Sequence, residues 1–107
     1  MAQTADQRLA AFAQTYLPRL REQWAPLEVI AFGSRARGDA LSTSDLDLIL
    51  VSPRFMSVPF LKRPVAVLEA LGFPAGLELL CYTPEEFQDK RQEFGIVRVA
   101  SEQGITL

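Results

Sequence analysis

The sequence predicts an α+β domain in which helices pack on one small β-sheet, and three observations support this. The chain has 107 residues, enough for one core but too few for two independent ones. Hydrophobic types make up 49% of the residues and charged types 22%, as in ordinary globular proteins. Strand-like apolar runs alternate with segments of helical periodicity. We therefore expect a single domain over residues 1–107.

The first third of the chain predicts a helix followed by a strand. Over Asp6–Trp24, apolar side chains recur every three or four residues with polar ones between them, as on an amphipathic helix. Pro18 conflicts with a continuous helix, because a proline inside a helix removes a hydrogen bond. The run Leu27–Phe32 is short, apolar and partly β-branched, which indicates a buried strand.

The middle of the chain predicts turns around its strongest strand. Gly33–Gly38 has a glycine at each end of a polar stretch, which indicates a turn or the first turn of a short helix. Ala40–Ser44 is rich in small hydroxyl residues and is predicted to be a loop. Asp45–Val51 has the strongest strand pattern of the sequence. The proline-rich segment Arg54–Pro64 is expected to be an irregular loop.

The last third predicts three helices and one more strand. Val65–Leu71 is a short helix ended by a glycine, and Gly76–Tyr82 is the third strand. Thr83–Phe94 begins with Thr-Pro-Glu-Glu, which combines a threonine N-cap, a proline at the first helical position and a capping box. Ile96–Glu102 predicts a final helix, and Ile105–Leu107 is left as a terminal stub.

Composition excludes several kinds of chemistry. Eleven basic and thirteen acidic residues give a formal net charge of −2, which disfavours a protein that binds nucleic acid mainly by charge. The chain has no histidine and one cysteine, Cys81, so it can form neither an internal disulfide nor a zinc site of Cys and His ligands. A histidine base is excluded as well. Any catalysis must use carboxylates, hydroxyls, arginines or a hard metal ion.

Neither a targeting segment nor a membrane span is predicted. The first eight residues are polar and contain an acid, unlike a signal peptide. The longest apolar runs have strand length and are too short to cross a bilayer. We therefore expect a soluble cytoplasmic protein, in which Cys81 is a small core residue.

Two carboxylates stand at the start of the strongest strand. Asp45 and Asp47 are two residues apart, and this spacing puts both side chains on one face of a strand. Like charges repel, and desolvation beside apolar residues makes each charge more costly. A divalent ion with oxygen ligands would compensate, and Mg²⁺ commonly binds one or two carboxylates together with substrate phosphates.

Glu78 is a third acid, in the otherwise apolar strand Gly76–Tyr82. If this strand lies beside Asp45–Val51, Glu78 can join the two aspartates on one face. Three acids so placed could hold two Mg²⁺ ions about 3.5–4 Å apart, the spacing used for in-line displacement at phosphorus.

A second cluster of candidate residues follows the first strand. Gly33 lets the backbone approach a phosphate without a Cβ in the way, and Ser34 can donate a hydrogen bond to it. Arg35 and Arg37 do not share a helix face, so we expect one of them to contact a phosphate and the other to lie at the surface. Lys62–Arg63 is expected to be a solvated pair.

The dipeptide Gly33–Ser34, ten intervening residues and then Asp45-Leu46-Asp47 resemble the signature of the DNA polymerase β-like nucleotidyltransferases. The fuller pattern GSRARG…SDLDLILV is similar to the minimal nucleotidyltransferases (MNT), the antitoxin-type partners of HEPN toxins. The similarity extends to Glu78 and to the helix start at Tyr82–Phe87, and so covers essentially the whole chain. It implies a nucleotidyltransferase fold with a mixed sheet.

The resemblance also implies a site and an activity. Mg²⁺ would be bound by Asp45, Asp47 and the position of Glu78, where many members have aspartate. The phosphates of ATP would contact Gly33 and Ser34. Family members of the antitoxin type transfer AMP from ATP to a hydroxyl, notably a tyrosine of the HEPN ribonuclease. There is no room for a separate acceptor domain, so a partner would supply the acceptor surface.

Two functions of different classes remain open. In the first, the protein is a Mg²⁺-dependent transferase that adenylylates a HEPN-type toxin. In the second, it is a catalytically silent binding module that neutralises its partner by forming a complex. Nucleic acid is disfavoured as a direct substrate, and both homo- and hetero-oligomers are compatible with the sequence.

Overall fold

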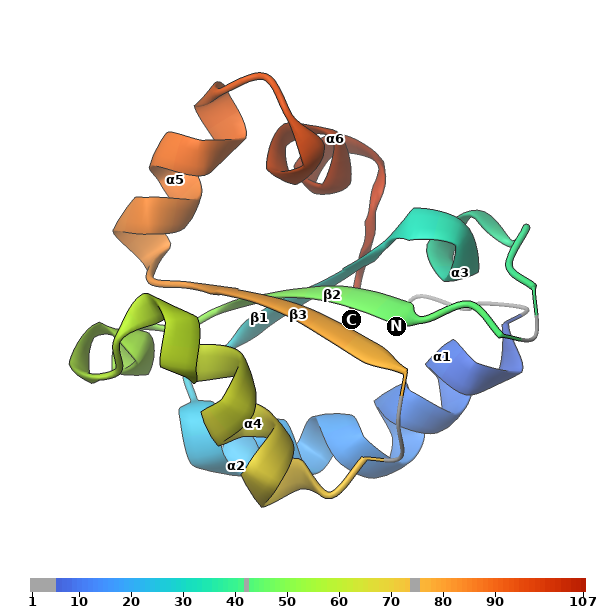
Figure 1. Cartoon of the computed structure of the whole chain (residues 1–107), viewed down its shortest axis with the longest axis horizontal. Helices are drawn as coiled ribbons and strands as arrows, with labels where there is room; N and C mark the ends of the chain where they lie inside the picture. The colour runs from blue at the N-terminus through green and yellow to red at the C-terminus, as the bar shows by residue number, and fades with distance from the viewer. Residues whose placement is uncertain (1–5, 42, 74–75) are drawn as a thin grey trace.

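A four-stranded mixed β-sheet lies at the centre of the molecule, between two layers of helices (Figure 1). The strands are β1 (Glu28–Phe32), β2 (Leu46–Val51), β3 (Leu77–Tyr82) and β4 (Ile105–Thr106). Their order is β3-β2-β1-β4, with β2 parallel to β3 and β1 antiparallel to both β2 and β4. This computed structural model describes residues 6–41, 43–73 and 76–107. The α+β class and the mixed sheet with flanking helices are confirmed.

Helices cover both faces of the sheet. The α-helices are α1 (Gln7–Ala11), α2 (Leu17–Trp24), α3 (Gly33–Arg37), α4 (Arg63–Leu71), α5 (Pro84–Gln92) and α6 (Ile96–Gln103). Helices α1, α2 and α4 lie on one face, and α5 and α6 lie on the other, while α3 follows the end of β1 (Figure 1). None of the helices in the described part of the chain is long and apolar enough to span a membrane.

Side chains of the central strand β2 alternate between the two layers. Leu46, Leu48 and Leu50 are fully buried in the core beneath α1, α2 and α4. Ile49 belongs to a smaller core on the α5–α6 side. Because successive strand residues point to opposite faces, Asp47 lies on the same side of the sheet as Ile49, towards α5 and α6. The alternation therefore decides which helices border the candidate site.

Cys81 lies in the larger core, as expected for a small apolar residue. Its side chain is buried, and burial raises the pKa of the thiol to about 12. A thiol that stays protonated is a poor nucleophile, which agrees with a packing role.

The predicted N-terminal helix forms, but not as one continuous α-helix. The π-helical turn η1 (Phe12–Tyr16) separates α1 from α2, and the Leu17 N–H donates to the carbonyl of Phe12, five residues earlier. This turn puts Pro18 in the first turn of α2, where a missing N–H costs least. Asp6 caps the start of α1, since its carboxylate accepts a hydrogen bond from the Leu9 N–H at 2.9 Å.

The segment Arg54–Pro64 was expected to be an irregular loop, and the structure shows otherwise. Most of its residues belong to two 3₁₀ helices, η2 (Pro53–Ser57) and η3 (Phe60–Lys62), and η3 leads directly into α4. Phe55 is fully buried and stacks against Trp24, with ring centroids 4.6 Å apart. This aromatic contact joins residues 31 positions apart, and together with the contact of Phe60 with Tyr82 it gives the proline-rich segment a defined shape.

The terminal stub is also different from its prediction, because it forms the edge strand β4. Ile105 pairs with Ala31 of β1, and the Leu107 N–H donates to the Val29 carbonyl at 2.9 Å. Two residues carry no strand periodicity, so only pairing with β1 identifies them as a strand.

Arg63 is buried, in contrast to the solvated pair expected for Lys62–Arg63. Its guanidinium donates to the carboxylate of Glu86 at 2.6 Å and to the carbonyls of Val58 and Cys81. Glu86 also closes the predicted capping box with Thr83, which the structure confirms. The hydrogen bond from Arg63 holds the pKa of the Glu86 carboxyl below its usual range. Arg63 thus joins η3 and α4 to β3 and to the start of α5.

We expect Arg63→Met to lower the free energy of unfolding by about 2 kcal/mol, because it leaves Glu86 and two carbonyls without this donor. Urea denaturation at pH 7 measures the change. The neighbouring exposed Lys62, changed to Met, is the matched control and should alter stability by less than about 0.5 kcal/mol. Equal losses in the two variants would show that the buried ion pair contributes nothing specific.

Candidate active site

Two of the three predicted acids face each other across neighbouring strands. In the parallel pairing of β2 with β3, Asp47 is the register partner of Glu78. Glu78 precedes Leu80 by two residues, and Leu80 packs with Ile49 on the α5–α6 side, so both acids stand on the same face of the sheet. The proximity of the Glu78 carboxyl is one of the causes that raise the pKa of Asp47.

The surroundings of Asp47 disfavour its charged form. Its pKa is raised to about 6, first by burial, then by the hydrogen bond to Glu78 and its charge, and then by the charge of Asp45. The positive charge of Arg37 acts in the opposite direction. Carboxyl groups with a pKa near neutral are typical of catalytic and metal-binding sites.

Asp45 does not complete a three-carboxylate group. It is exposed and lies one residue before β2, where the strand ladder has not yet begun. Its charge still contributes to the raised pKa of Asp47. Within residues 6–41, 43–73 and 76–107, no three His, Cys, Asp or Glu side chains lie close enough together to hold a metal ion. The structure therefore brings two of the predicted ligands together and leaves the third beside them.

Gly33 lies directly beneath the carboxylate of Asp47. Its φ is +75°, a conformation that favours glycine, and a methyl group built on its Cα would overlap the Oδ2 atom of Asp47. The antiparallel pairing of β1 with β2 places Phe32 opposite Asp47, which brings the next residue, Gly33, under the acid. The absence of a side chain at Gly33 thus lets another group come close to the backbone. The sequence analysis expected this group to be a phosphate, and in the structure the Asp47 carboxylate lies there.

Ser34 and Arg37 lie on α3, next to the carboxyl pair. Ser34 is half-buried in the first turn, and its backbone carbonyl accepts from the N–H groups of Gly38 and Asp39. Arg37 is exposed and pairs with Asp39 at 3.2 Å. Since Arg37 lowers the pKa of Asp47, its positive charge acts directly on the acid pair.

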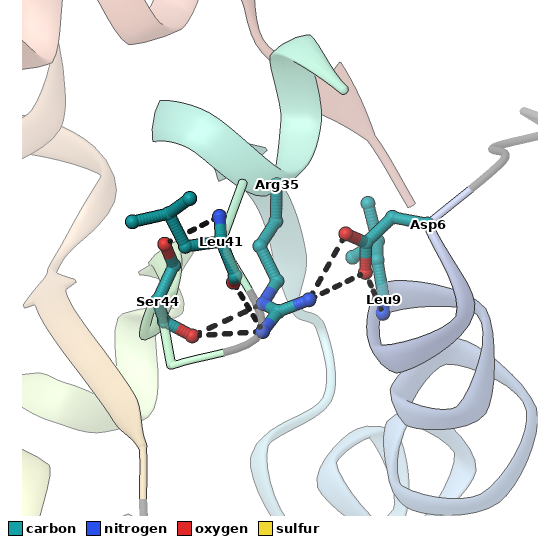
Figure 2. Close-up of polar contacts among 5 residues, drawn as sticks. All are labelled: Asp6, Leu9, Arg35, Leu41 and Ser44. Atoms are coloured by element: carbon teal, nitrogen blue, oxygen red, sulfur yellow. Dashed lines mark hydrogen bonds and ion pairs between the residues drawn. The ribbon is translucent and has the colours of Figure 1, made fainter. Parts of the chain in front are cut away.

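Arg35 has a structural role, which corrects its assignment as a candidate phosphate contact. Figure 2 shows its buried guanidinium between the Asp6 carboxylate, 3.1 Å away, and the carbonyls of Leu41 and Ser44. These contacts join the start of α1 to α3 and to the loop that leads into β2. Of the two arginines, Arg37 is therefore the candidate for contact with substrate. Asp6 lies 29 residues from Arg35 in the chain, so no local sequence pattern pairs them.

The chain is similar to known proteins over the region that carries these residues. A family model described as nucleotidyltransferase domain matches residues 14–100, which include the acid pair, Gly33 and most of α6. This chain belongs to the nucleotidyltransferase domain family. None of the curated proteins matches the sequence. Among solved structures, one from Sulfolobus solfataricus assigned as a nucleotidyltransferase is 25% identical, with a TM-score of 0.56 over 78% of this chain and 73% of that one.

The acid pair of this nucleotidyltransferase domain has the chemistry that a divalent ion requires. Its donors are carboxylate oxygens, the ligands that Mg²⁺ prefers, and the chain has no histidine to offer in their place. A cation between Asp47 and Glu78 would offset the repulsion between their charges, which is one of the causes of the raised pKa of Asp47. The pair therefore fits a hard cation.

The nucleotidyltransferase domain should lose stability as pH rises from about 4 to about 6 in the absence of divalent cations. Folded Asp47 keeps its proton to about pH 6, whereas the unfolded chain releases it near pH 4, so folding binds a proton in this window and deprotonation weakens the fold. Chemical denaturation from pH 4 to 8 in EDTA measures the change.

Asp47→Asn removes this titration, so the difference in stability between variant and wild type isolates it from the titration of Glu86. That difference should grow from pH 4 to pH 6 and then level off. A constant difference across the range would contradict the raised pKa.

Proposed function

We propose that this nucleotidyltransferase transfers AMP from ATP to a hydroxyl of a partner protein, a HEPN-type toxin. The observation that carries the proposal is the in-register carboxyl pair of Asp47 and Glu78, with Gly33 beneath it. An acid pair of this kind weakens the fold at neutral pH, and a role in catalysis accounts for its presence.

The reaction makes and breaks one bond at phosphorus. The acceptor oxygen bonds to the α-phosphorus of ATP, the bond from that phosphorus to the bridging oxygen of the β-phosphate breaks, and pyrophosphate leaves. The proton of the acceptor hydroxyl passes to a carboxylate of the pair. Asp47 and Glu78, joined by Asp45, would hold Mg²⁺, which when bound neutralises charge that develops on the phosphates.

The start of α3 positions the triphosphate in this proposal. Gly33 has no side chain to separate the backbone from a phosphate, and Ser34 offers a hydroxyl donor one residue later. Arg37 supplies a positive charge on the same side as Asp47, and its exposed guanidinium can exchange Asp39 for a phosphate.

A protein partner is supported by the surface as well as by the similarity to minimal nucleotidyltransferases. Large apolar side chains are exposed on the stretch from η2 to α4, namely Met56, Phe60, Leu61 and Val65. Exposed apolar residues that gather on one surface favour contact with another protein. The toxin would then supply the acceptor hydroxyl.

The silent binding module is the second candidate, and the position of Asp45 favours it. An acid pair without the third carboxylate is an incomplete version of the expected ligand set. In that case the same exposed apolar surface would neutralise the partner by complex formation alone.

Intact-mass measurement separates the two functions. The protein is incubated with the HEPN-type product of a neighbouring gene, ATP and Mg²⁺, and the masses of both chains are determined. Gain of one AMP moiety by the partner, abolished by EDTA or by Asp47→Asn, is the expected result. A tight complex with unchanged masses, formed equally by Asp47→Asn, would replace the enzyme with the binding module.

A further inference from the structure

We propose that the hollow beside Asp47 binds the base of the nucleoside triphosphate and that Gln103 selects adenine there. The proposal rests on nucleotidyl transfer as the proposed function. It adds the part of the site that recognises the nucleotide, which neither the acid pair nor the start of α3 explains.

The hollow adjoins the residues that are proposed to hold the phosphates and the metal ion. Its volume is about 160 Å³. It lies between α6 on one side and the end of β1 and α3 on the other, and both Gly33 and Asp47 line it. Pockets that enclose a whole ligand usually measure about 300–1,000 Å³. The hollow is therefore the right size for one part of a nucleotide, next to the atoms proposed to hold its phosphates.

Most of the side chains that line the hollow are apolar. Ile96 and Val99 of α6 line it although they are 60% and 53% exposed, and half-buried Phe32 adds an aromatic ring from β1. Large apolar side chains exposed beside a candidate active site indicate a surface that a ligand covers. The flat faces of a base are suited to this, because they stack on aromatic and apolar side chains.

The position of α6 against the sheet is fixed by Gly104. A methyl group at this residue would come within 2.6 Å of Ile30 Cγ2 and within 2.8 Å of the Ala31 carbonyl oxygen. Only glycine lets the end of α6 approach β1 so closely, and Gly104 itself lines the hollow. The wall that carries Val99 is thus held by packing before any ligand binds.

Gln103 supplies the specific contact. It is the last residue of α6, it is exposed, and in the part of the chain that the structure describes its side-chain amide has no hydrogen-bond partner. A glutamine amide donates and accepts at once, which matches the N7 acceptor and N6 donor of adenine. Guanine presents two acceptors on the same edge and suits arginine instead. Arg37 also lines the hollow, so the choice between ATP and GTP reports which side chain contacts the base.

Isothermal titration calorimetry in the presence of Mg²⁺ tests the proposal with ATP, GTP and inorganic tripolyphosphate. We expect the protein to bind ATP more tightly than GTP or tripolyphosphate. Gln103→Ala should lower the affinity for ATP about tenfold, because two hydrogen bonds are lost, and should leave the affinity for tripolyphosphate unchanged. Val99→Ser should lower the affinity for both nucleotides but not for tripolyphosphate. Gln92→Ala is the matched control, since Gln92 ends α5 as Gln103 ends α6 and lines a different hollow.

Three results would overturn the proposal: equal affinity for ATP and tripolyphosphate, a preference for GTP, or an unchanged ATP affinity in Gln103→Ala. If tripolyphosphate still binds in those cases, the phosphate site stands and only the base site is lost. If none of the three ligands binds, the proposed function fails, and the base site fails with it.

Discussion

Asp47→Asn is expected to lower the rate of nucleotidyl transfer roughly 10²–10⁴-fold while raising the thermal stability of the metal-free protein at pH 7.5. The variant removes a carboxylate that would bind Mg²⁺ in the proposed reaction. It also removes a negative charge that burial, Glu78 and Asp45 all disfavour, and its neutral amide can still donate a hydrogen bond to Glu78. Loss of activity with gain of stability is the signature of a functional acid.

The two effects are measured separately. Release of pyrophosphate from ATP in the presence of the partner reports the rate, and a thermal melt in EDTA reports stability. Glu22→Gln is the control, because Glu22 is an exposed acid of α2, on the opposite side of the sheet from Asp47. A variant of Asp47 that melts earlier than the wild type, or that transfers at the same rate, would contradict the assignment.

Gly33→Ala is expected to lower the free energy of unfolding by about 3 kcal/mol and to reduce transfer together with it. About 1–2 kcal/mol comes from forcing an alanine into the left-handed conformation at φ +75°. Overlap of the new methyl group with the Asp47 carboxylate adds about 1–3 kcal/mol, in the range measured for overpacking. The carboxylate must also move away from its position opposite Glu78, which affects catalysis.

Gly38→Ala separates the two contributions to this loss. Gly38 has a φ of +85°, but a methyl group there meets no atom within 4 Å. It should therefore show the conformational cost alone and keep its activity. The double variant Gly33→Ala with Asp47→Ala should regain the stability that the overlap costs, but it should not regain the part that backbone strain costs. Equal losses in the Gly33 and Gly38 variants would show that no close contact exists between Gly33 and Asp47.

Features that depend on near neighbours in the chain were predictable from the sequence. The capping box at Thr83 joins residues three positions apart, and β2 is recognisable as a run of apolar residues. Asp47 and Glu78 could be selected as candidate site residues because an acid inside an apolar strand is costly when it is buried, although the structure shows that only Asp47 is partly buried and that Glu78 is exposed. The nucleotidyltransferase family could also be recognised, because the main part of its motif lies in one continuous segment of the chain.

Features that depend on distant contacts needed the tertiary structure. Both arginines assigned to solvent or substrate, Arg35 and Arg63, are buried because Asp6 and Glu86 reach them from other elements. Gln103 had no signal in the sequence, since its place beside Asp47 follows from the packing of α6 on β1.

The amino-acid sequence is enough to identify the chemical groups that this domain can use: carboxylates, arginines and the Gly33–Ser34 pair, with no histidine. Which of these groups lie together depends on the packing of the strands. The parallel register of β2 with β3 joins Asp47 to Glu78 and leaves Asp45 outside the ladder. Periodicity assigns side chains to a face of one strand, but the partner on the next strand is chosen by packing across the whole sheet, which no local pattern encodes.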